Sequence, residues 1–424
     1  MFNQGGLSLE QAPPISVVLK FFITASLFGI FLGVYFFLNS TGRFCFERHI
    51  VYVTSIHLLA LGVMASFMLG ALFQMLPVIA GVVIKVPKSK SMIAHIALFI
   101  GVLLQVTAFG TTDSIYYLLS AIVLGLGLLH ATALMIKEII QIKNHSNSSL
   151  GMLFALGGFS IAILFGVYLL LTLGGYIDGS FFTPIKEAHY SFALFGWVTL
   201  LIVSISFQVI EMFYVTPKFS PLLSKYFSVT IFIILILKTI VLFMGLDSAI
   251  LDIVTALLFI IYASITIYQL YKRRRPTRDA TVWFWRLGMG LLIFSSLIII
   301  INNLIGLDDR VEMLGHFAFI GFVLSIIFAM VYKIVPFLVW FHLSNQGYME
   351  APMMFDVIHP KRAKIHFWIH LCTIILWFSS VLYGPLTIFS SLFLSLSFAW
   401  LLYHLLFALK KYNYTQKYTK KMEW

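Results

Sequence analysis

The feature that most constrains this chain is the recurrence of apolar runs about twenty residues long, from near its start to residue 409. A helix needs about 20 apolar residues to cross the ~30 Å hydrocarbon core of a bilayer. Of the 424 residues, 61% are hydrophobic and 10% are charged, whereas soluble domains are roughly half apolar and a quarter charged. The alternating ten-residue segments of a membrane β-barrel are absent from the sequence. The sequence therefore predicts an all-α polytopic membrane protein.

Twelve such runs lie between polar or basic separators. The separators include VPKSK (86–90), NHSNSS (144–149), GYIDGSFFTP (175–184), KRRRPTRD (272–279) and GLDDR (306–310). The predicted spans are 15–38, 50–76, 91–110, 115–136, 150–174, 187–213, 223–245, 249–271, 280–303, 312–335, 363–383 and 386–409. The one long connection in this prediction is residues 337–362.

The distribution of basic residues predicts the orientation. With twelve spans both termini share a side, and 21 of the 28 Lys and Arg residues fall on that side, against four on the other. Basic loops stay in the cytoplasm, so we expect cytoplasmic termini and a bacterial-type inner membrane, with lipid as one partner. The net charge of +12 is explained by these loops, and we expect no nucleic-acid binding. The polar start, MFNQGGLSLEQAPP, lacks the basic region of a cleavable signal, so the first span is expected to be retained.

Two of the runs share a pattern: HLLALGVMASFMLGALFQMLP (57–77) and HFAFIGFVLSIIFAMVYKIVP (316–336). Each has a histidine first, a glycine five residues later and a proline twenty residues later. A third histidine, His189, lies near the start of the sixth span. The three histidines are 132 and 127 residues apart, which is four spans each time. This spacing predicts one membrane domain, 1–424, with a threefold repeat of a four-helix unit. The units are roughly 15–136, 150–271 and 280–409.

The histidines of the matched runs, His57 and His316, are candidate ligands for a cofactor. Both fall in the outer part of the predicted membrane. A single membrane histidine is explained by a hydrogen bond to a neighbouring helix, but a matched pair favours a functional site. Two neutral imidazoles facing each other across a bundle are suited to be axial ligands of a six-coordinate haem iron. The two cysteines form no haem-attachment motif, so such a haem would not be held by thioether bonds.

Two further sets of residues fit a haem. Gly62 and Gly321 occupy matched positions and would leave room for a flat macrocycle. Close helix packing explains any single glycine equally well, but it explains the matched pair less readily. Arg43, Arg48 and Arg310 lie in outer loops at the expected depth of the haem. They are candidates to pair with the propionates, with anchoring at the membrane surface as the alternative.

These features resemble the catalytic subunit I of haem–copper oxidases and nitric oxide reductases. The tenth span reads LGHFAFIG (314–321) and YKIVP (332–336), similar to H-G-H-L-A-F-x-G and Y-x-x-P in the nitric oxide reductases. On the second span the family has G-A-x-Y-x-x-P after the histidine. Here the corresponding residues are Gly70, Ala71, Phe73, Leu76 and Pro77. The resemblance implies that His57 and His316 are the axial pair of a low-spin haem b.

The chain departs from this family at the binuclear centre. The first histidine of the family's H-x-H is Leu314 here, and the seventh span contains no histidine. His189 stands where the family has a copper ligand, but the position four residues later is Ala193. A copper site needs more than one imidazole ligand, so the sequence gives little support for bound copper. We therefore do not expect reduction of oxygen or nitric oxide by the family's mechanism.

The sequence thus predicts a haem b-binding membrane protein with a redox or electron-transfer role, served by a quinol or cytochrome partner. A transporter or assembly factor for haem or copper is one alternative, and an unconventional reductase built around His189 is another. His366, His370 and His404 fall near the cytoplasmic ends of their spans, where interfacial water is expected to satisfy them. No polar chain is expected to cross the bilayer.

Overall fold

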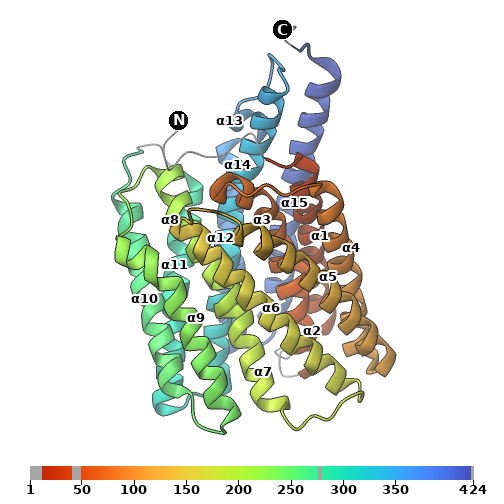
Figure 1. The fold of residues 1–424 in the computed structure, drawn as a ribbon, viewed down its shortest axis with the longest axis vertical. Helices are drawn as coiled ribbons and strands as arrows, with labels where there is room; N and C mark the ends of the chain where they lie inside the picture. The colour runs from red at the N-terminus through yellow and green to blue at the C-terminus, as the bar shows by residue number, and fades with distance from the viewer. Residues whose placement is uncertain (1–11, 41–48, 276–278, 422–424) are drawn as a thin grey trace. The chain divides into compact units, whose positions relative to one another are not determined.

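A computed structural model describes residues 12–40, 49–275 and 279–421 of the chain, coloured along its length in Figure 1. Among these residues, twelve helices are long and apolar enough to cross a membrane. Each overlaps one of the twelve predicted spans. The all-α polytopic fold is therefore confirmed.

The chain divides into two compact units, each made of separate parts of the sequence. Unit 1 consists of Met1–Pro13, Ala71–Pro276 and Leu292–Asp308, and unit 2 of Pro14–Gly70, Thr277–Leu291 and Asp309–Trp424. The division falls inside two helices, α3 (Ser66–Ala80) and α11 (Ala280–Ile305). The threefold repeat stays a prediction.

Unit 2 contains the candidate haem ligands His57 and His316. Its elements, beside parts of α3 and α11, are α1 (Ile15–Asn39), α2 (His49–His57), the π-helix η3 (Leu58–Ala65), α12 (Asp309–Asn345), α13 (Met354–Val357), α14 (Pro360–Leu382) and α15 (Leu386–Tyr418). Helix α12 is the most buried of the spans, and it packs against α1, η3, α14 and α15. Residues on α12 therefore lie at the centre of this unit.

Unit 1 contains His189. Its elements, beside the remainder of α3 and α11, are α4 (Pro87–Thr111), α5 (Ser114–Ile140), α6 (Asn147–Leu173), α7 (Phe182–Ser191), the π-helix η4 (Phe192–Thr199), α8 (Leu200–Tyr214), α9 (Pro221–Phe243) and α10 (Ala249–Tyr271). Side-chain caps begin several of these helices: Asp113 accepts a hydrogen bond from the Ile115 amide, and Ser146 from the Ser149 amide. Such caps satisfy amides that the first turn of a helix leaves unpaired.

Two predicted helix ends differ most from the structure. The predicted tenth span ends at residue 335, but α12 continues through Pro336 to Asn345. Residues 337–343 are apolar apart from His342, and most are buried in unit 2, so packing supports the helix beyond the proline. The predicted connection 337–362 is therefore shorter, and it includes the short helix α13. The last helix, α15, likewise extends past 409 to Tyr418.

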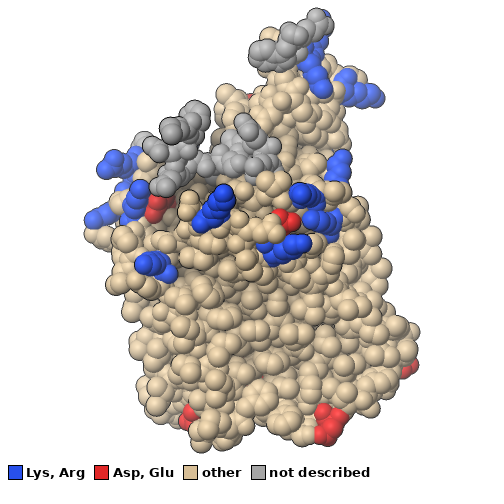
Figure 2. Space-filling model, in the orientation of Figure 1, with Lys and Arg blue, Asp and Glu red and all other residues tan. Residues whose placement is uncertain are grey.

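Basic residues concentrate at one end of the helices of unit 1. The loops from α3 to α4, from α5 to α6 and from α8 to α9 carry Lys85, Lys143 and Lys218, and alternate loops of an antiparallel bundle lie at the same end. On the face drawn in Figure 2, Lys and Arg side chains gather over this end of the unit. This pattern is the one that predicted a cytoplasmic location for these loops.

Candidate functional site

His57 is the last residue of α2, and the π-helix η3 begins at the next residue. Its Nδ1 atom lies 2.8 Å from the carbonyl oxygen of Val53. A carbonyl oxygen only accepts, so the proton of the neutral ring is on Nδ1 and the lone pair is on Nε2. Ligating histidines in proteins commonly have this arrangement, in which one nitrogen donates to the backbone and the other binds the metal.

His316 lies on α12, in the same unit as His57. It is half-buried, and its Nδ1 atom is buried without a hydrogen-bond partner in the described part of the chain. The ring centroid of Tyr52, which precedes His57 by five residues on α2, lies 6.4 Å from that of His316. Glu312, one turn before His316, lies within electrostatic range of the Tyr52 hydroxyl and of the His316 ring. The structure thus brings the segment that carries His57 against the helix that carries His316.

The two matched glycines make close helix contacts in this structure. A Cβ atom at Gly62 would lie 2.9 Å from Cγ of Phe28 on α1. At Gly321 it would lie 2.9 Å from Cδ1 of Leu291 on α11 and 3.4 Å from Cδ1 of Ile374 on α14. Both glycines therefore allow neighbouring side chains to pack closely. Their expected role in making room for a macrocycle stays a prediction, and it requires these side chains to shift.

The three candidate arginines are placed only in part. Arg43 and Arg48 lie outside the described residues. Arg310 is exposed in the first turn of α12, six residues before His316. Arg310 was predicted to lie in a loop, and the structure places it on α12 because that helix begins at Asp309; its pairing with a propionate stays a prediction.

His189 in unit 1 has two features in common with His57. Its Nδ1 atom lies 2.8 Å from the carbonyl oxygen of Ala162 on α6, so its lone pair is also on Nε2. The π-helix η4 begins three residues later, at Phe192. Segments of π-helix within α-helices are rare, and they are found frequently at functional sites. Among the described residues, however, no group of three or more His, Cys, Asp or Glu side chains could hold a metal ion.

Three histidines that the sequence placed near interfacial water are instead buried in unit 2. The exposed fractions of His366, His370 and His404 are 0%, 1% and 1%. The expectation that water satisfies them is therefore wrong for this structure: His366 and His370 bond to side chains of α12 and α15. These partners lie more than thirty residues away in the chain, so sequence spacing alone could not identify them.

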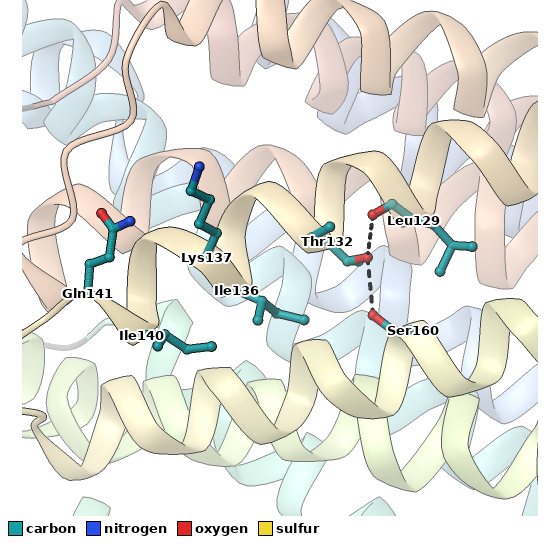
Figure 3. Close-up of a pocket in the computed structure, with 8 residues that line it drawn as sticks. Leu129, Thr132, Ile136, Lys137, Ile140, Gln141 and Ser160 are labelled. Carbon is teal, nitrogen blue, oxygen red and sulfur yellow. Dashed lines mark hydrogen bonds between the residues drawn. The ribbon is translucent and has the colours of Figure 1, made fainter.

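A groove lies between α5 and α6 of unit 1 (Figure 3). Its lining is mostly apolar, with Lys137 and Gln141 at one end. Towards the other end, beside Leu129, Ser160 donates a hydrogen bond of 3.1 Å to the Thr132 hydroxyl, which donates to the Leu129 carbonyl. None of the predicted site residues lines this groove.

Comparison with known proteins adds no assignment to this geometry. No protein-family model and no curated protein matches the chain.

Proposed function

We propose that unit 2 binds one low-spin haem b through His57 and His316, and that the protein transfers electrons. The observation that carries this proposal is the hydrogen bond from His57 Nδ1 to the Val53 carbonyl, because it directs the Nε2 lone pair to ligation. When bound, such a haem supplies a one-electron couple at its iron. The side chains of the protein hold the ligands, exclude water and set the local charge.

The residues present fit this group in their chemistry. Both ligands are imidazoles within one unit, and Tyr52 connects their helices through its contact with His316. His316 Nδ1 is a buried polar atom without a partner in the described chain, and such atoms are uncommon unless they serve a ligand or water. One condition applies: Phe28 and Leu291, which now fill the space beside Gly62 and Gly321, must adjust.

The setting of the proposed site favours electron transfer over gas reduction. Leu314 replaces the histidine that would hold a second haem, and α9 carries no histidine that could bind copper. A quinol or a cytochrome is the expected electron donor. The basic loops support cytoplasmic termini in a bacterial-type inner membrane, so the histidines would lie in the outer half of the bilayer.

The test is a reduced-minus-oxidised visible spectrum of the purified protein, repeated under carbon monoxide, with haem quantified per chain. One low-spin b-type haem per chain that does not respond to carbon monoxide would support the proposal. A haem that binds carbon monoxide has an open coordination position, and it would favour a reductase that uses His189. Protein that lacks haem after expression with excess haem would contradict the proposal.

A further inference from the structure

The groove between α5 and α6 of unit 1 follows one face of α5. All but one of its lining residues belong to α5 or to its C-terminal cap, and they recur every three or four positions from Leu129 to Gln141. The remaining one is Ser160 on α6. A helix rises about 18 Å between Leu129 and Gln141, and half of the ~30 Å hydrocarbon core is about 15 Å. The groove is therefore about as long as one leaflet is deep.

The two ends of the groove differ in polarity (Figure 3). Lys137 and Gln141 lie at one end, and the loop from α5 to α6 adds Lys143 beyond them. This is the end of unit 1 at which basic side chains gather in Figure 2. Towards the other end, deeper in the expected membrane, the hydroxyls of Ser160 and Thr132 donate their protons to acceptors within the protein. The deep end can therefore take a hydrocarbon chain without leaving a hydroxyl proton unpaired.

The ammonium group of Lys137 is exposed and has no carboxylate partner among the described residues. The ion pairs in this part of the chain are made by Lys90, Lys238 and Lys333. Glu138, the next residue after Lys137, belongs to the first of these pairs, at 3.9 Å from Lys90 on α4. An unpaired ammonium at the depth of the lipid headgroups attracts anionic lipid. This end of the groove is thus complementary in charge to a phosphate group.

The groove has the size and opening of a site for a molecule that enters from the bilayer. It holds about 530 Å³ and is open on one side, and ligand sites commonly hold about 300–1,000 Å³. Leu126 and Ile140, on the same helix, are exposed apolar side chains, as expected of a surface that faces lipid. A second copy of the chain is a poorer occupant, because the net charge of +12 would bring further positive charge towards Lys137.

We propose that this groove binds one anionic phospholipid, with its phosphate beside Lys137 and one acyl chain along α5 from Gln141 to Leu129. The inference goes beyond the proposed haem and does not depend on it. A zwitterionic lipid carries its own cation beside the phosphate, which offsets the attraction of Lys137. Net charge of the headgroup therefore decides which phospholipid binds, and the apolar lining holds its chain.

The first experiment is native mass spectrometry of the purified protein in a mild detergent. The protein is titrated with phosphatidylglycerol and, separately, with phosphatidylcholine that has the same acyl chains. We expect the unmodified protein to bind the first phosphatidylglycerol more tightly. Lys137→Gln should weaken that binding about fivefold, the effect of one lysine near an anionic surface, and leave phosphatidylcholine binding unchanged. Lys85→Gln, at an exposed position of the loop from α3 to α4, is the matched control and should keep the preference.

A variant that fills the groove tests the position of the acyl chain. Ala133 lies midway along the lining and is exposed, so Ala133→Phe should place a ring in the groove and weaken the binding of both lipids. Ile233→Phe, at an exposed position of α9, adds a ring to the same unit outside the groove and should change neither. Equal binding of lipid by Ala133→Phe and the unmodified protein would overturn the inference.

A second measurement locates the lipid on the protein. Phosphatidylglycerol with a diazirine at the end of one acyl chain should label the peptide that contains Leu129, and unlabelled phosphatidylglycerol should compete better than phosphatidylcholine. Labelling spread evenly over the spans would show only the lipid that surrounds any membrane protein, and it would overturn the inference. Equal affinities for the two lipids, or equal effects of Lys137→Gln and Lys85→Gln, would do the same. A quinone or a second copy of the chain found against Leu129 in place of phospholipid would also overturn it.

Discussion

Nδ1 of His57 lies 2.8 Å from the carbonyl oxygen of Val53, one turn earlier on α2. This bond fixes both the orientation of the ring and the position of its proton before any ligand binds. Preorganisation of this kind reduces the cost of holding a ligand in its bound geometry. The proposed role of His57 as a haem ligand can be tested by substitution.

His57→Ala and His316→Ala should each abolish the low-spin haem signal, because a six-coordinate iron needs both imidazoles. The measurement is the visible difference spectrum with haem quantified per chain. Leu314→Ala and His130→Ala, an exposed histidine on α5, are the controls and should keep the signal. An unchanged spectrum in both histidine variants would remove the basis of the proposed function.

Removing one partner of the ion pair of Lys238 and Asp252 in unit 1 should be strongly destabilising. The Lys238 Nζ atom lies 2.5 Å from an Asp252 carboxylate oxygen, and the side chains are 4% and 19% exposed. Ser248 donates to the other carboxylate oxygen at 3.2 Å. Removing one partner of a buried pair typically costs about 3–5 kcal/mol, because the other charge is left uncompensated. Lys238→Met should therefore lower the free energy of unfolding in detergent micelles by about that amount.

The double variant Lys238→Met with Asp252→Asn is the control for this pair. It removes both charges, so it should be more stable than Lys238→Met alone. Asp252→Asn alone completes the cycle, and losses of the two single variants that simply add in the double variant would show that the residues do not interact.

The helices could be predicted from the sequence because membrane spans have a strong local signal. A run of about twenty apolar residues between polar or basic loops predicts a helix without any knowledge of the helices that pack against it. The continuation of α12 beyond Pro336 could not be predicted in this way. It depends on the burial of residues such as Leu338 and Phe341 by other helices of unit 2, which is a tertiary effect.

The candidate site could be predicted in part for a similar reason. His57 and His316 stand out because their runs repeat one pattern, and the structure places both in unit 2. The environment of His366 could not be predicted, because Tyr332 and Ser397 are 34 and 31 residues away along the chain. Residues near the ends of spans look accessible in a sequence, whereas packing of α12, α14 and α15 buries them.

The pair of Asp279 and Lys333 should make the stability of unit 2 depend on pH in the acid range. Burial alone raises the pKa of the Asp279 carboxyl, but the Lys333 ammonium at 2.5 Å and hydrogen bonds from Thr281 outweigh it and hold the pKa below its usual range. The stabilisation is present above the unfolded pKa of about 3.9 and is lost as pH falls through the lower folded pKa.

Asp279→Asn should therefore lower the melting temperature at neutral pH, and the difference from the unmodified protein should shrink below about pH 4. Thermal unfolding in detergent at a series of pH values measures this difference. Glu350→Gln, which changes an exposed carboxylate of the same unit, is the control. A gap that stays constant down to the lowest pH would contradict a lowered pKa for Asp279.

Gly158 on α6 lies close to the backbone of the π-helix η4 that follows His189. A Cβ atom at this position would lie 2.5 Å from the carbonyl oxygen of Gly196, which is backbone and cannot rotate away. The neighbouring rings of Phe159 and Trp197 stack with centroids 4.3 Å apart, so separating the helices would disturb that contact too. Gly158→Ala should lower the free energy of unfolding by about 1–3 kcal/mol, as overpacking does in well-packed cores.

The adjacent Gly157 provides a matched control for this substitution. A Cβ atom at Gly157 would lie 3.6 Å from the ring of Phe232, an ordinary van der Waals distance. Gly157→Ala should therefore be tolerated, and it can stabilise the helix by up to about 1 kcal/mol, since alanine is a better helix former than glycine. Unfolding of both variants in the same detergent compares identical chemical changes one residue apart. Equal stabilities would mean that the contact between α6 and η4 is looser than the structure places it.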